Sequence, residues 1–567
     1  MSVQMLLAGM LFSSVASARS VDGIPLSLDE VQLRDGLMAS YQAHFGQDEH
    51  ELEHALSEEH RGGTCLTGLV RELKLSWHLF TAEERAEMTS KLAPSKFDLL
   101  DPMIPAGTAA LGADGPPPPG SCWGEQKDYV IDTEHFSVQW DEGDITLSQA
   151  EDFAESLEYS YDIEIDELGW REPTGVSTYK VLIMVERGGG GGAYTTTEYC
   201  GGNQLPYVVA YSGSFSSSSG DWYKTMACHE LHHAIQFSYG YAHEFWYWEA
   251  SATWMEDLVY PDLNDWANSI YVYSLVPYMG MNASRTGGGS DEYLFYHTYA
   301  MGIWGMFLDE HVGGNELVRD TWDVSRTSNC SYCLWMPDAI ERTGQSFDDL
   351  YPEFIATNAV MDYEDRLWLR TPELSDEVDG LPAAGESHYS DRPQSLGQNF
   401  IKFDASLGGS GDALEITFDG DGSADSWVVV LARGEREIEE YVQMEIDGSM
   451  SGVAQIDFPG DAPIHLIVSP INEDDQGPYY NWSTPDDYDY EWSAQLVAST
   501  SSGDDDDDDD DDDGSGSSDL GSVAEGDAEG EVIGRKGEGC ACSSTRSGQS
   551  GWLVLMLGMV PWVRRRR

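Results

Sequence analysis

The sequence predicts an α+β protein in which a domain of mixed helices and strands is followed by an all-β module. Three observations support this class. Between residues 122 and 375, segments with helical spacing of apolar residues alternate with short runs rich in Val, Ile and Tyr. After about residue 385 such runs alternate with Gly-Asp turns, and the helical spacing stops. A chain of 567 residues is also too long for one ordinary core, which indicates two or three domains.

The charge balance of the chain is strongly acidic. It has 101 Asp and Glu against 30 Lys and Arg, a formal net charge of −71. A surface of this sign repels phosphate backbones, so the composition excludes a nucleic-acid partner. We interpret the charge as a solvated acidic shell.

The first 121 residues divide into a leader and a helical region. Residues 1–18 have a short apolar core that ends in Ala16-Ser17-Ala18, which is typical of a signal peptide, although a buried N-terminal helix is an alternative. Residues 19–121 contain the helical patterns LDEVQLRDGLMASYQAHF and TAEERAEMTSKL and end in the Pro/Gly linker GADGPPPPGS. This region is a candidate inhibitory propeptide.

The elements of the mixed domain, residues 122–375, follow from local pattern. HFSVQW, YKVLIMV and PYVVAY are expected to be strands, and LSQAEDFAESLEYSYDIEIDEL a long amphipathic helix. The run GGGGG is expected to be flexible backbone, and PYVVAY is a candidate edge strand for pairing with an extended substrate.

The C-terminal third is predicted to be a β-sandwich, residues 385–500, followed by a disordered acidic stalk, residues 501–538. Asp419, Asp421 and Asp425 are a candidate Ca²⁺ site, although ordinary turn aspartates are the preferred interpretation. Disulfides are expected because six cysteines lie outside the tail, an even number: Cys65, Cys122, Cys200, Cys228, Cys330 and Cys333.

The C-terminal tail, residues 539–567, combines a Gly-Cys motif, an apolar run from Trp552 to Val563 and four arginines. It resembles the MYXO-CTERM sorting signal. The resemblance implies cleavage near Cys540 or Cys542 and anchoring at the cell surface, on the outer membrane. Contact with a membrane is expected only through this tail.

The segment MACHELHHAIQF, residues 226–237, contains an HExxH motif formed by His229, Glu230 and His233. No Pro or Gly interrupts residues 222–238, so a helix is expected. Side chains four residues apart lie on one face of a helix, so both imidazoles can reach a single Zn²⁺. Glu230 would lie beside the ion, where it can act as a general base towards water.

A third ligand is expected from the following segment, HEFWYWEASATWMEDLVYP. The helix runs about 9 Å beyond His233, and a second helix that starts near Glu244 and returns antiparallel brings Glu249 level with it. Glu249 also lies among aromatic residues, where an unpaired carboxylate would be costly. His243 is an alternative ligand, and a purely structural role for Glu249 is another. Glu256 and Asp257 are candidates to orient a ligand imidazole.

The block HELHHAIQF…WYWEASATWMED resembles the gluzincin clan of zinc metallopeptidases, and more closely a family of secreted metallopeptidases that often carry MYXO-CTERM tails. The resemblance covers about residues 122–375. It implies a zincin-like catalytic domain with an HExxH helix and a mixed sheet, His229, His233 and Glu249 as ligands of one catalytic Zn²⁺, and Glu230 as general base.

The sequence therefore predicts a secreted, surface-anchored zinc endopeptidase that acts on proteins or peptides. Among the aromatic residues of FYHTYAMG, Tyr299 is the preferred candidate to stabilise the oxyanion, although core packing is an alternative for it. The alternative function is a non-catalytic surface binding or adhesion protein with a structural zinc site, which would normally have four protein ligands.

Overall fold

A computed structural model describes most of the chain between residues 20 and 499. The described residues are 20–21, 24–26, 28–45, 64–67, 69–70, 73, 76–92, 127–188, 192–200, 203–216, 220–283, 292–328, 333–472 and 486–499. The predicted signal peptide, acidic stalk and sorting tail lie outside these residues and stay predictions. Within the described residues, no helix has the length and apolar character needed to cross a membrane.

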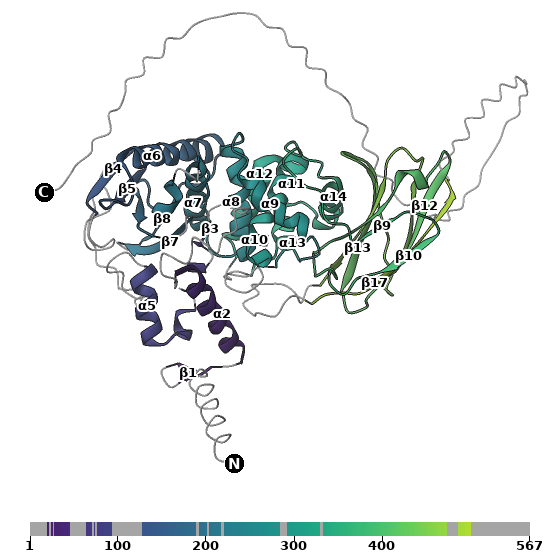
Figure 1. Cartoon of the computed structure of the whole chain (residues 1–567), viewed down its shortest axis with the longest axis horizontal. Coiled ribbons are helices and arrows are strands. Elements are labelled where there is room, and N and C mark those ends of the chain that lie inside the picture. Colours follow the sequence, from purple (N-terminus) through teal and green to yellow (C-terminus); the bar gives the residue numbers. More distant parts are fainter. Residues whose placement is uncertain are drawn as a thin grey trace, which may run out of the picture.

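The α+β class is confirmed: the first part of the structure combines helices with a mixed six-stranded sheet, and a β-rich region follows (Figure 1). The strand order is β3-β7-β8-β6-β5-β4. Strands β5, β6 and β8 are mutually parallel, whereas β4 runs antiparallel to β5, and β7 runs antiparallel to β8 and parallel to β3. The bounds are β3 Thr64–Cys65, β4 Tyr129–Asp132, β5 Phe136–Trp140, β6 Val181–Glu186, β7 Gly192–Cys200 and β8 Asn203–Tyr211.

The three strands expected from the sequence are confirmed as β5, β6 and β8, but the position predicted for PYVVAY is wrong. This segment belongs to β8, which lies between β6 and β7 and therefore has no free edge. The strand that covers it, β7, begins at Gly192, within the glycine run that was expected to be flexible. Its Thr195, Thr196 and Thr197 have the β-branched side chains that favour a strand.

Both faces of this sheet are covered, which explains why β6 and β8 are apolar almost throughout. Val181, Ile183 and Val185 pack on one face with helices α6 (Leu147–Tyr161) and α7 (Trp222–Tyr239). Leu182 and Met184 pack on the other face with the N-terminal helices α2 (Leu28–Phe45) and α5 (Ala82–Leu92). Figure 1 shows the two pairs of helices on opposite sides of the sheet.

The predicted long helix is confirmed as α6 and the π-helical turn η2 (Asp162–Glu167) that continues it. Its first turn is fixed by a capping box in which the hydroxyl of Thr146 accepts from the Gln149 amide and the Gln149 side chain accepts from the Thr146 amide. The other short elements are β1 Ser20–Val21, β2 Ile24–Pro25, η1 Trp77–Leu79, η3 Ser212–Phe215 and η5 Ala405–Leu407.

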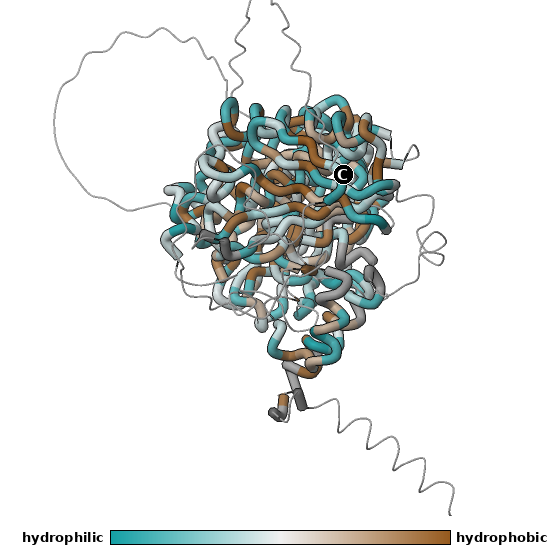
Figure 2. Tube along the Cα trace, turned by 90° about the vertical axis from the view of Figure 1, so that its left-hand side faces the viewer, coloured by the Kyte–Doolittle hydropathy of each residue, from teal (hydrophilic) through white to brown (hydrophobic). Residues whose placement is uncertain are grey.

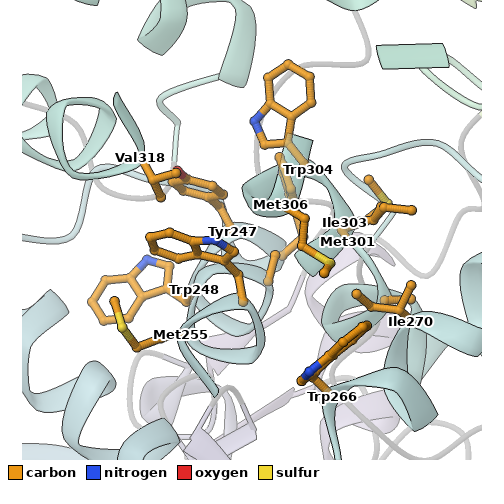
Figure 3. Packing of buried hydrophobic residues seen from close by; sticks show 14 of the residues in the cluster. Tyr247, Trp248, Met255, Trp266, Ile270, Met301, Ile303, Trp304, Met306 and Val318 are labelled. Carbon is orange, nitrogen blue, oxygen red and sulfur yellow. The ribbon is translucent and has the colours of Figure 1, made fainter. Parts of the chain in front are cut away.

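A layer of helices built around α8 (Phe245–Val259) follows α7. Trp248 and Met255 of α8 share one aromatic-rich cluster with Trp266 and Trp304 from neighbouring helices (Figure 3). Gly305 lets its helix approach, because a Cβ there would lie 2.8 Å from Trp254. The remaining helices are α9 Trp266–Leu275, α10 Glu292–Ala300, α11 Gly302–Phe307, η4 Leu308–Gly313, α12 Gly314–Ser325, α13 Met336–Thr343 and α14 Phe347–Val360.

The β-rich region consists of two sheets, with strand orders β10-β17-β12-β15 and β14-β13-β16-β11-β9, which enclose a common apolar core. Residues on the other face of the second sheet, such as Val430 and Ile467, join the core of the helical layer. In Figure 2 the hydrophobic segments accordingly run through the interior and the hydrophilic ones lie outside. The bounds are β9 Asp376–Val378, β10 Ala383–Glu386, β11 Asn399–Phe403, β12 Asp412–Gly420, β13 Ser426–Gly434, β14 Ile438–Gln443, β15 Ser451–Asp457, β16 Ile464–Ile471 and β17 Tyr490–Ala498.

Among the described residues, one cysteine is disulfide-bonded and another has a free thiol. Cys333 is disulfide-bonded, as expected for the class of chain that the sequence predicts. Cys228 carries a free thiol and is buried, so the expectation that all six cysteines pair is wrong for this one. Its sulfur lies 3.5 Å from the carbonyl of Met255 and packs between α7 and α8.

Candidate metal centre

The two histidines of the HExxH motif lie on α7, as the sequence predicts. The helix is uninterrupted from Trp222 to Tyr239 and ends at Gly240, whose φ of +116° favours glycine. One helical turn separates His229 from His233, so both imidazoles project from the same face. The side chains are almost fully buried, with exposed fractions of 4% for His229 and 0% for His233.

Helix α8 returns antiparallel to α7 and supplies Glu249. Two contacts fix the direction: the Gln236 amide donates to the carbonyl of Trp248, and Cys228, two turns earlier, contacts Met255. In this arrangement Glu249 Oε2 lies 3.3 Å from Nε2 of His229 and 3.3 Å from Nε2 of His233. One ligand atom from each of these three residues lies within 4.8 Å of the others, so the group could hold a metal ion.

The other nitrogen of each imidazole has an oxygen partner, which fixes the orientation of both rings. His229 Nδ1 lies 2.7 Å from Glu256 Oε1, and His233 Nδ1 lies 2.8 Å from Gln236 Oε1. When Nδ1 donates to an oxygen, the lone pair of a neutral imidazole is on Nε2, the atom that faces Glu249. The donor set is therefore two imidazole nitrogens and a carboxylate, a set that suits zinc.

The carboxyl groups around the histidines have shifted pKa values. Burial raises the pKa of Glu249, but the adjacent His233 and His229 outweigh this effect and hold it well below its usual range. Burial also raises the pKa of Glu256, and its hydrogen bond to His229 opposes this rise without cancelling it. Glu249 is thus kept ionised, the form in which a carboxylate binds a cation.

Glu230 follows His229 on α7 and does not belong to the three-residue group. Its Oε2 accepts a hydrogen bond from the hydroxyl of Thr195, at 2.6 Å, and from that of Thr67, at 3.3 Å. Thr195 comes from strand β7, and Thr67 follows strand β3. The side chain of Glu230 is 1% exposed. Glu230 is therefore outside the three-residue group, and its expected role as a general base towards water stays a prediction.

The third histidine of the segment, His232, points away from the group. Its Nδ1 lies 2.8 Å from Glu164 Oε2, and its ring packs edge-on against Trp170. Burial raises the pKa of Glu164 and lowers the pKa of His232, so the pair is held in its uncharged forms. His232 therefore anchors α7 to the turn after α6.

The remaining sequence-based candidates lie in different places. His243 is not in the group: its Nε2 contacts the carbonyl of Thr321 at 2.8 Å, and its ring packs on Trp322. Glu256 contacts the imidazole of His229, one of the two rings expected to bind the metal. Asp257 follows Glu256 on α8, and the groups that act on its carboxyl are Asp365, Trp266, Asp309 and Glu256. In the part of the chain that the structure describes, the aspartates at 419, 421 and 425 form no group of metal ligands.

Sequence reasoning missed three residues of the site: Gln236, Thr195 and Thr67. The position of Gln236 could have been predicted from the sequence, since it follows His233 by three residues and so shares its helix face. The positions of the two threonines could not, because they reach Glu230 only through the pairing of distant strands. Tyr299, a candidate from the sequence, does lie near the group: its ring stacks on His229 with centroids 6.0 Å apart.

Comparisons with known proteins identify a family for this chain, but they do not indicate an activity. No curated protein matches the chain. The pre-peptidase C-terminal domain of a collagenase from Bacillus anthracis is similar to 23% of this chain over 99% of its own length, with 15% identity and a TM-score of 0.15. The model of a family of unknown function, DUF6055, matches residues 132–433, which is more than half of the chain. This protein therefore belongs to the DUF6055 family.

Proposed function

We propose that this protein is a zinc-dependent endopeptidase with a zincin-like catalytic domain. The observation that carries the proposal is the convergence of ligand atoms from His229, His233 and Glu249, with Glu230 next to His229 on the same helix. Three protein donors leave one coordination position for water or substrate, which is typical of catalytic zinc and not of structural zinc.

The residues of the site fit the chemistry of peptide hydrolysis. Zn²⁺, when bound, supplies a Lewis acid that polarises a peptide carbonyl and increases the acidity of a nearby water. Glu230 would accept a proton from that water as it attacks the carbonyl carbon, and would then deliver the proton to the leaving nitrogen. Glu256 and Gln236 would hold the two imidazoles so that each presents Nε2.

Tyr299 is our candidate for the donor to the carbonyl oxygen in the transition state. It reaches the site from α10 and stacks on His229 at an interplanar angle of 23°. The other polar ring of this segment, His297, is fully buried, and burial lowers its pKa to about 4. A neutral core histidine of this kind is less suited than a phenol near the ligands.

Export to the cell surface remains part of the proposal and rests on the sequences of both ends, outside the described residues. The disulfide at Cys333 supports it, because such bonds persist in oxidising compartments. The substrates would then be proteins or peptides outside the cytoplasm.

The alternative function, a surface binding protein with a structural metal, has one observation in its favour. The three ligand side chains are at most 7% exposed, as in closed structural sites. Against it stands the ligand count, since a structural zinc would normally have a fourth protein ligand.

The exchange of Glu230 for Gln tests the proposed function. An amide keeps the size of the side chain but cannot accept the proton, so Glu230→Gln should retain zinc and lose about 10²- to 10⁴-fold in casein hydrolysis. Glu155→Gln, at an exposed position of α6, is the matched control and should behave as the wild type. Casein hydrolysis that survives in pure Glu230→Gln protein would refute the mechanism.

A further inference from the structure

Strand β7 pairs with β8 along only one of its edges, so a peptide could bind along the other edge. The strand also contacts Glu230, the proposed general base. The strand pairs with β8 along one edge, while the hydroxyl of Thr195 reaches Glu230 at 2.6 Å. The open edge of a strand presents unpaired backbone N–H and C=O groups, and an extended peptide binds such an edge by adding a strand. A peptide that paired with β7 at this point would lie beside Glu230.

Residues 64–67 of the same chain occupy this edge. Thr64 and Cys65 pair in parallel with Gly192 and Ala193 of β7. The next two residues continue the contact: the amide of Leu66 donates to the carbonyl of Ala193 at 2.8 Å, and the amide of Thr195 donates to the hydroxyl of Thr67 at 2.7 Å. The backbone groups that an incoming peptide would need are therefore already bonded.

Thr67 also contacts the catalytic machinery itself. Its hydroxyl donates to Oε2 of Glu230 at 3.3 Å, and the side chain is 1% exposed. Together with Thr195 it places two hydroxyl donors on the oxygen of a carboxylate whose proposed task is to accept a proton from water. Donors on that oxygen compete with the water for it.

The segment is held by the N-terminal block, the described residues 28–45, 64–67, 69–70, 73 and 76–92, which covers the second face of the sheet. Leu66, Leu69 and Val70 share a core with Tyr207 and Val209 of β8. Loss of the whole block would expose this apolar face, which a soluble protein tolerates poorly. Local detachment of residues 64–67 would free the β7 edge and leave the rest of the layer in place.

We propose that residues 64–67 are a built-in blocking strand that occupies the peptide-binding edge of β7 and restrains Glu230, so that the intact chain is latent. Its displacement by an extended peptide, or by an event that loosens the N-terminal block, opens the site. The inference rests on the proposed peptidase function and adds to it the edge at which a peptide substrate binds.

Leu66→Pro tests the blocking strand, because proline cannot donate to Ala193 and is poorly accommodated in a paired strand. We expect zinc transfer to a colorimetric chelator and casein hydrolysis both to rise about tenfold, the effect of losing one or two net hydrogen bonds. Ala82→Pro is the matched control, since it places proline at the first residue of α5, where no amide donor is needed. Unchanged rates in folded Leu66→Pro would overturn the inference.

Thr67→Ala is a second variant that leaves the backbone pairing of Leu66 intact. It removes the contacts to Glu230 and to the Thr195 amide and should raise both rates, whereas Thr327→Ala, at an exposed threonine after α12, should not. If Leu66→Pro does not fold, this pair decides the question: equal rates for Thr67→Ala and Thr327→Ala would overturn the inference.

The two proposals fail in different ways. If zinc leaves faster from Leu66→Pro and Thr67→Ala but no variant hydrolyses casein, the blocking strand stands and the peptidase function falls. If the intact chain hydrolyses casein as fast as both variants do, the peptidase function stands and the blocking strand falls.

Discussion

Each ligand imidazole has a partner of its own, and the two partners differ in chemistry. His229 meets the carboxylate of Glu256, whereas His233 meets the amide oxygen of Gln236. Gln236 is in turn held by its amide nitrogen, which donates to the carbonyl of Trp248 at 2.9 Å and to the hydroxyl of Ser251 at 3.0 Å. One buried side chain thus ties His233 to the helix that carries Glu249.

Gln236→Met should therefore weaken zinc binding without removing a ligand. Methionine is similar in size but cannot accept from His233 Nδ1 or donate to α8, and the loss of such an outer partner typically costs 10- to 100-fold in metal affinity. Competition with a zinc chelator measures this change. Gln204→Met, at a partly buried glutamine of β8 that bonds Thr197 and Tyr241, is the control. Equal affinities for the two variants would show that Gln236 does not position His233.

At the scale of elements, the antiparallel pair α7 and α8 forms the site, and its far end contains a carboxyl group in an unfavourable environment. Asp257 lies near the end of α8, and its carboxyl is largely buried beside Trp266. Burial and the nearby charge of Asp365 raise the pKa of Asp257 from 3.8 to about 7. An acid whose pKa is higher in the folded state costs stability as the pH rises through the interval between the two values.

Asp257→Asn should accordingly stabilise the protein at pH 8 and have little effect at pH 4. At pH 8 the wild-type carboxylate is ionised in an unfavourable environment, and the amide removes that charge. We expect the melting temperature at pH 8 to rise by about 2–4 °C, the shift that about 1 kcal/mol produces in a domain of this size. Scanning calorimetry at both pH values measures it, with the exposed Asp262→Asn as control. An equal shift at pH 4 would contradict the electrostatic cause.

The elements near the motif could be predicted because their pattern is local. The helix through His233 and the level of Glu249 on the next helix follow from a rise of about 1.5 Å per residue and a short connection. By contrast, Glu164 is 68 positions from His232, and Thr67 is 163 positions from Glu230. Such contacts depend on the packing of distant elements, which periodicity does not encode.

At the scale of the whole molecule, the six-stranded sheet joins two layers of helices, which the patterns of its single strands did not indicate. The apolar runs of β6 and β8 were expected as strands, but their burial on two faces requires a second layer, and the described residues of the N-terminal block supply it. The described N-terminal helices and the six-stranded sheet therefore share one core. The two-sheet region is likewise continuous with the helical layer, through Val430 and Ile467.

This shared packing places two helices, a strand edge and the N-terminal block around one group of ligands. Every functional step proposed for Glu230 requires a metal held by His229, His233 and Glu249. Variants of two nearby residues serve as controls for variants of the proposed ligands. Glu256 contacts the ring of His229, and His243 lies in a separate part of the core.

The most direct test is a zinc titration of the full chain and of three variants against a chelator of known affinity. Glu249→Ala removes a ligand and should weaken binding by several orders of magnitude, whereas Glu256→Ala should lose only about 10- to 100-fold. His243→Ala should bind zinc as the wild type does. If Glu249→Ala holds zinc like the wild type while His243→Ala loses it, the ligand set proposed here is wrong.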